Sequence, residues 1–162
     1  MITIFQSIGY KIIKVGIIDP IKTQVEIRLS NKRGYDIALN HINRVDGKTL
    51  IRLNDTKGLE ILKTQLIDLK VFKENEIIIL YSSRKNKKSK EYKQLAHERI
   101  FDDKVKLVLT TSIIDEGLSI NQTDFTDVVF IETNYNPRPE PIKQFFARFR
   151  NEDKNRKNYL YL

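Results

Sequence analysis

From residue 49 onward the chain alternates short apolar runs with amphipathic segments, and this alternation constrains the fold more than any other feature. Between the runs, apolar residues recur at helical spacing, as Leu59, Leu62, Leu66 and Leu69 do. Parallel neighbouring strands need crossover connections, which helices supply. We therefore predict a three-layer αβα fold of the α/β class, with a mostly parallel central sheet. Its strands are expected at residues 49–53, 77–81, 105–109, 128–131 and 159–162.

Two further elements are expected before residue 49. Apolar and polar residues alternate over residues 23–29, as in a half-buried strand. Ser30 and Asn31 offer capping oxygens for a helix over residues 35–45. Helices are also expected over residues 92–99 and, opening at a proline, over residues 139–150. His41 and His97 would lie on helix surfaces, which leaves no histidine-based metal site.

Composition narrows the class of protein. The chain has no cysteine, which excludes disulfides, thiolate zinc sites and cysteine nucleophiles. No apolar run reaches the ~18 residues of a membrane span, and the start lacks the order of a signal peptide, so a cytoplasmic protein without membrane contact is expected. A net charge of +8 favours a polyanionic partner, DNA or RNA before an anionic surface.

Phosphate-binding sequences are absent. No G-x-x-x-x-G-K-[ST] loop and no G-x-G-x-x-G turn occurs, and the six glycines are not clustered. The chain is therefore not expected to hold a nucleoside triphosphate by itself.

Two segments carry the most information. Residues 107–120, LVLTTSIIDEGLSI, read as a buried strand that ends in hydroxyls and is followed by a glycine six residues after Thr111. Residues 144–151, QFFARFRN, combine Gln144 with Arg148 and Arg150 one strand later. In order and separation the two resemble the fifth and sixth motifs of superfamily 2 DEAD/DEAH-type helicases, in their C-terminal, second RecA-like domain.

The resemblance extends upstream. Residues 47–55 fall where the family has its fourth motif, and residues 81–83 fall at the next strand end. It thus implies a C-terminal helicase domain over residues 47–162. Residues 1–46 would hold the strands and first helix that follow a missing N-terminal motor domain, all in one compact domain.

The resemblance also implies roles for individual residues. Gln144, Arg148 and Arg150 would be catalytic, the arginines acting as fingers on a triphosphate. Gly117 and Ser119 would lie near the nucleotide, although Ser119 stands where the family usually has an acid, and Arg150 one position early. Both arginines can face one nucleotide only if the helix ends or bends between them. The nucleic-acid backbone would be contacted by Thr110, Thr111, Asn54, Ser82 and Ser83.

The function implied is that of a motor domain of an ATP-dependent helicase or translocase on single-stranded DNA or RNA, inactive alone. ATP with Mg²⁺ would be held mainly by the missing N-terminal RecA-like domain of the same protein. Three alternatives stay open. The arginines could form a solvated basic face, and Thr111 and Ser112 could simply cap a helix over residues 113–116. The chain could also be a non-catalytic α/β module that binds nucleic acid or an acidic protein through Arg148, Arg150, Arg156 and the basic run at residues 84–90.

Overall fold

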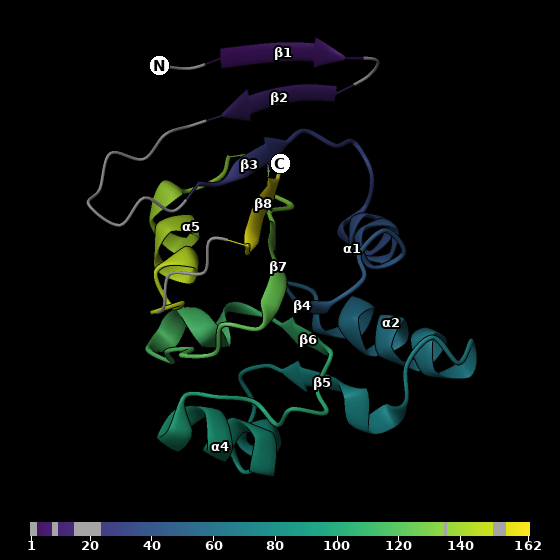
Figure 1. Ribbon diagram of the computed structural model, residues 1–162, viewed down its shortest axis with the longest axis vertical. Coiled ribbons are helices and arrows are strands. Elements are labelled where there is room, and N and C mark those ends of the chain that lie inside the picture. The colour runs from purple at the N-terminus through teal and green to yellow at the C-terminus, as the bar shows by residue number, and fades with distance from the viewer. Residues whose placement is uncertain (1–2, 8–9, 15–23, 135, 151–154) are drawn as a thin grey trace.

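Within the described residues, eight strands form one sheet, with β1 and β2 at one end of the protein (Figure 1). The structure is a computed structural model that describes residues 3–7, 10–14, 24–134, 136–150 and 155–162. The strand order is β1-β2-β3-β8-β7-β4-β6-β5, in which β1 and β2 are antiparallel and the six strands from β3 to β5 are parallel. The strands are β1 (Thr3–Ser7), β2 (Tyr10–Lys14), β3 (Glu26–Arg28), β4 (Lys48–Leu53), β5 (Ile77–Leu80), β6 (Leu107–Thr110), β7 (Phe125–Ile131) and β8 (Lys157–Tyr161).

Helices cover both faces of this sheet, which confirms the predicted three layers (Figure 1). Helices α1 (Gly34–Ile42) and α2 (Thr56–Asp68) pack on one face. The other face carries α4 (Lys90–Glu98), α5 (Pro139–Phe146) and the 3₁₀ helix η2 (Ser112–Glu116). Two short helices, η1 (Glu74–Glu76) and α3 (Arg84–Lys87), flank β5. Within the described residues, no helix is long and apolar enough to cross a membrane.

The strand registers bring the predicted loops to one edge. Arg52 of β4 pairs with both Thr110 of β6 and Phe130 of β7, while Leu80 of β5 also pairs with Thr110. The carboxyl ends of β4, β5, β6 and β7 therefore lie side by side. In parallel sheets ligands bind outside this edge, so the fold places the polar strand ends where a site is expected.

Helix ends show where sequence patterns succeed and fail. Asp55 caps α2 as predicted, because its Oδ1 accepts a hydrogen bond from the Gly58 N–H at 2.9 Å. The predicted cap of α1 at Ser30 and Asn31 is wrong, since α1 begins at Gly34 and its N-cap residue, Arg33, makes no side-chain cap. Gly34 approaches Leu53 so closely that an added Cβ would lie 2.5 Å from Leu53 Cδ1, and this packing fixes where α1 starts.

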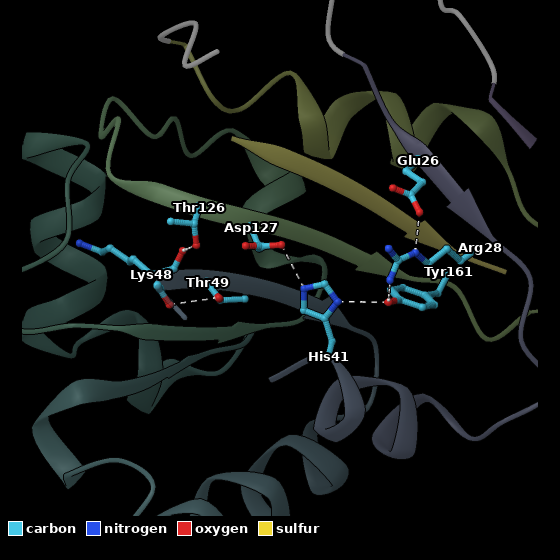
Figure 2. Close-up of polar contacts among 9 residues, drawn as sticks. Glu26, Arg28, His41, Lys48, Thr49, Thr126, Asp127 and Tyr161 are labelled. Carbon is cyan, nitrogen blue, oxygen red and sulfur yellow. Dashed lines mark hydrogen bonds and ion pairs between the residues drawn. The ribbon is translucent and has the colours of Figure 1, made fainter. Parts of the chain in front are cut away.

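His41 is buried, so its predicted place on a helix surface is wrong. Its side chain reaches from the last turn of α1 between two strands (Figure 2). Its Nε2 lies 3.5 Å from Oδ1 of Asp127, and its Nδ1 lies 3.1 Å from the hydroxyl of Tyr161. The position of His41 four residues after the buried Ile37 was the available signal. His97 is exposed, as predicted.

Arg28 continues this series of polar contacts beyond Tyr161 (Figure 2). Its guanidinium donates to Glu26 at 2.8 Å and to the Tyr161 hydroxyl at 2.9 Å. Burial acts to lower the pKa of Arg28, but the hydrogen bonds to Glu26 and Tyr161 outweigh it and raise the pKa above its ordinary value. Burial, with the nearby charge of Asp127, also raises the pKa of Tyr159.

Replacing His41 is expected to destabilise the fold. His41→Leu removes the only described side chain that faces the buried Asp127 carboxylate within ion-pair distance. Leaving such a group without a partner lowers the free energy of unfolding by about 2 kcal/mol, measured by urea denaturation. His97→Leu is the matched control, expected to change it by less than ~0.5 kcal/mol. Equal effects of the two variants would contradict the role assigned to the His41 contacts.

Candidate functional site

The strand order predicts a ligand-binding crevice at the carboxyl end of the sheet, between β4 and β6. The segment after β4 becomes α2 on one face, whereas the segment after β6 becomes η2 on the opposite face. Neighbouring strands whose connections leave in opposite directions create a crevice at their carboxyl ends, where open α/β sheets bind ligands. The predicted residues Asn54, Ser82, Thr110 and Thr111 lie at or just after the carboxyl ends of β4, β5 and β6.

Gly117 ends the η2 segment in a conformation that suits glycine. Its φ of +113° lies in the left-handed region, and an added Cβ would meet no atom within 4 Å. The backbone beside Gly117 is thus open to an approaching group. Thr111 is the N-cap residue of η2, but its side chain makes no cap hydrogen bond, so the alternative in which its hydroxyl caps this helix is wrong.

The segment after α5 pairs with the segment after η2. Helix α5 ends at Phe146, so the helix predicted over residues 139–150 is wrong in its last turn. Phe149 then forms a parallel bridge with Ile120. The Ile120 N–H donates to the Arg148 carbonyl at 2.7 Å, and the Arg150 N–H donates to the Ile120 carbonyl at 3.0 Å. This early helix end meets the condition under which both arginines can face one ligand.

Both arginine side chains contact the loop that follows β6. Arg148 is half-buried and donates from Nη2 to the backbone carbonyl of Asp115. Its Nε is buried and has no hydrogen-bond partner among the described residues. Arg150 is exposed, and its Nε donates to the hydroxyl of Ser119 at 3.3 Å. The two segments that resemble the fifth and sixth motifs therefore lie in contact. Each guanidinium has further N–H groups that could donate to a ligand.

A buried charge pair that the sequence analysis did not identify supports this loop. Arg52 of β4 is only 6% exposed, and its Nη2 and Nε lie 2.8 and 3.1 Å from Oδ2 of Asp115. The guanidinium also lies 4.0 Å from the ring centroid of Phe130, in a cation–π contact. An arginine inside an otherwise apolar predicted strand was the signal. Asp115 thus links β4 through its carboxylate to Arg148 through its carbonyl.

The other predicted site residues differ in accessibility. Asn54 and Ser82 are exposed at the carboxyl edge of the sheet, Gln144 is exposed on α5, and the Ser83 hydroxyl accepts a hydrogen bond from the Asn86 N–H at 3.0 Å. Thr110 is instead fully buried and Thr111 is 5% exposed. Their contact with a nucleic-acid backbone stays a prediction, as do the roles of the other site residues.

The fold is RecA-like and is similar to that of three solved helicase and ATPase structures. The chain is similar to the C-terminal domain of the DEAD-box protein Dbp5, with a TM-score of 0.57 and 16% identity over 79% of this chain and 68% of that one. It is similar to the C-terminal part of the Fun30 ATPase domain, with a TM-score of 0.54 and 20% identity over 81% of this chain. It also resembles the DUF1998 helicase MrfA, solved bound to DNA, with a TM-score of 0.51 and 13% identity over 85% of this chain.

The chain spans 41% of the Fun30 structure and 20% of the MrfA structure. Its sequence matches no profile of a known protein family and no curated protein. At these identities the likeness concerns the fold.

Proposed function

We propose that this chain is the C-terminal motor domain of an ATP-dependent helicase or translocase, which completes a nucleotide site founded by another domain. The observation that carries the proposal is the backbone pairing of Ile120 with Phe149, which places Arg148 and Arg150 against the loop after β6. The helicase-like fold supports the same assignment. Two guanidinium groups beside an open glycine suit the binding of phosphate oxygens brought from outside.

ATP with Mg²⁺ is the proposed cofactor, held mainly by an N-terminal RecA-like domain. The residues present fit a contributing role, because Arg150 is exposed and the space beside Gly117 is free of described side chains. Arg148 and Arg150 would approach the triphosphate, and Ser119 would approach the ribose. Bound ATP supplies the phosphoryl group whose transfer to water drives the motor, and the arginines would stabilise charge on its oxygens. The chain alone is expected to show no ATP turnover.

Single-stranded DNA or RNA is the proposed track. Exposed polar groups, among them Asn54 and Ser82, gather at the carboxyl edge, and the basic run at residues 84–90 follows β5 at that same edge. In a chain of net charge +8, these groups can neutralise backbone phosphates. The second candidate function is a non-catalytic α/β module that holds nucleic acid or protein through the same basic groups.

The salt dependence of binding tests the proposed track. We expect the chain to bind labelled oligo(dT) or oligo(U), with log Kd rising linearly with log salt concentration. Lys88 and Lys90 are exposed, so Lys88→Ala with Lys90→Ala is expected to reduce the slope by about 1.4, at ~0.7 per phosphate contact on a single strand. Fluorescence anisotropy between low and moderate salt measures the slope.

The matched control removes two exposed lysines from the opposite edge of the sheet. Lys70 follows α2 and Lys104 precedes β6, so both lie near the amino ends of the strands. Lys70→Ala with Lys104→Ala removes the same charge and is expected to leave the slope nearly unchanged. An equal loss in both double variants would mean that binding follows net charge alone, and no binding at all would count against the proposed track.

The two candidate functions differ in their response to a second domain. A motor domain should gain ATP turnover that depends on nucleic acid when it is combined with an N-terminal RecA-like domain that carries a phosphate-binding loop. A binding module should hold nucleic acid equally with and without that domain and should never support turnover.

A further inference from the structure

The outer edge of β5 lies in a groove on the side of the strand that faces away from β6. β5 is the last strand of the sheet, and α2 and α4 flank it (Figure 1). Side chains from both helices line a groove of about 970 Å³ along the strand. Glu60 and Lys63 come from α2, and Lys90 and Gln94 come from α4. The edge of β5 therefore lies in this groove, between side chains of α2 and α4.

The backbone on the outer side of β5 is available for pairing. On the inner side, the carbonyls of Glu76 and Leu80 accept hydrogen bonds from the strand β6 and its flanking residues. Because strand residues alternate, Ile77 and Ile79 direct their backbone N–H and C=O groups outward, as Tyr81 does its N–H, whereas the Tyr81 carbonyl accepts from the Ser83 N–H at 2.9 Å. No other described strand pairs with this side.

One side-chain amide already occupies part of this edge. Asn86 donates from Nδ2 to the Ile79 carbonyl at 2.8 Å, and its Oδ1 accepts from the Tyr81 N–H at 3.2 Å. The Asn86 amide thus makes the same pair of hydrogen bonds that the N–H and C=O of one residue of an added parallel strand would make. Its presence shows that the outward groups are aligned for an amide partner.

The charge of the groove distinguishes it from the rest of the surface. Three lysines and four carboxylates line it, in a chain whose net charge is +8. A nucleic-acid strand would meet more acids than bases there. A neutral or basic peptide is instead compatible with the carboxylates of Glu60, Glu74, Glu91 and Asp102.

The position of α2 and α4 on either side of the groove favours a single extended peptide over a second copy of the chain. A second copy of the chain would bring its own α2 and α4 to the groove together with its β5. A lone extended segment needs only the width of one strand, about 4.8 Å from its neighbour. The geometry fits an isolated peptide better than an edge-to-edge dimer.

We propose that β5 binds an extended, neutral to basic peptide segment of a partner protein, which adds to the sheet as an outer strand and displaces the Asn86 amide. Main-chain hydrogen bonds supply most of the affinity in this mode of recognition. The inference needs neither the arginines nor ATP, but Lys90 lines this groove and also belongs to the basic run proposed to bind nucleic acid.

The test uses a labelled peptide of alternating threonine and valine with a lysine at each end. Its control is the same peptide methylated on alternate backbone nitrogens. We expect the unmethylated peptide to bind the chain and Asn86→Ala to tighten binding about fivefold, since the competing amide is gone. Ile79→Pro removes one outward N–H while leaving the hydrogen bonds to β6, and is expected to weaken binding about fivefold or more. Ile79→Val is its matched control.

Several results would overturn the proposal. One is equal binding of the methylated and unmethylated peptides, or no binding by Asn86→Ala up to about 1 mM peptide. Self-association that Ile79→Pro abolishes would assign the edge to a second copy of the chain, and displacement of the peptide by oligo(dT) would assign it to nucleic acid. Loss of ATP turnover or of salt-dependent DNA binding would bear on the proposed motor function alone.

Discussion

Arg148→Ala is expected to lower ATP turnover by ~10³ to 10⁵ when the chain acts with a domain that carries a phosphate-binding loop. The guanidinium would stabilise charge that develops on the phosphate oxygens during transfer, and alanine offers no substitute. Affinity for single-stranded nucleic acid should stay within about twofold, because Arg148 contacts the Asp115 carbonyl and not the basic run at residues 84–90. Steady-state turnover and anisotropy on the same preparation measure the two quantities.

Two further variants sharpen this prediction. Arg148→Lys keeps the charge but loses the planar fork, so turnover should remain strongly reduced. Arg138 is exposed at the other end of α5, and Arg138→Ala is expected to leave turnover nearly unchanged. Parallel losses of turnover and nucleic-acid affinity in Arg148→Ala would count against its role on ATP.

Arg52→Met is expected to lower the free energy of unfolding by about 3 to 5 kcal/mol. Its guanidinium holds the carboxylate of Asp115, which is largely buried, and breaking a buried ion pair from one side leaves the remaining charge without that compensation. Methionine nearly fills the volume, so most of the loss would be electrostatic. Urea denaturation followed by circular dichroism measures it.

The double variant Arg52→Met with Asp115→Leu separates charge from packing. Replacing both members of a buried pair is often close to neutral, so this variant should regain much of the stability lost in Arg52→Met. Arg33 is exposed before α1, and Arg33→Met is the control, expected to change stability by less than ~0.5 kcal/mol. A single variant as stable as the control would show that the Arg52 contact contributes little.

Periodicity predicted the layers and most elements, because each strand and helix buries one repeating set of apolar residues. Periodicity did not predict helix ends or the burial of polar residues, because contacts between distant parts of the chain determine both. Leu69 continues the apolar spacing of α2 but is 63% exposed, since the helix ends at Asp68. The residue type of His41 favours a helix surface, but its burial depends on Asp127 and Tyr161, which are distant in the sequence.

The site shows the same division. The resemblance implied that Gly117 and Ser119 approach the same nucleotide as Arg148 and Arg150, and the structure brings the two segments into contact. Spacing alone could not show that α5 stops at Phe146, because Phe149 continues its apolar pattern. Nor could it pair Arg52 with Asp115, since the two meet only when β4 and β6 lie side by side.

The bridge between Ile120 and Phe149 has a consequence for how such chains can diverge. Because backbone atoms make it, the bridge sets the offset between Gly117 and Arg148 without requiring particular side chains at either residue. The loop between β7 and α5 can therefore gain or lose residues while the arginines keep their register. Insertions there would be tolerated, whereas a single deletion between Phe146 and Arg150 would shift both guanidinium groups relative to the glycine.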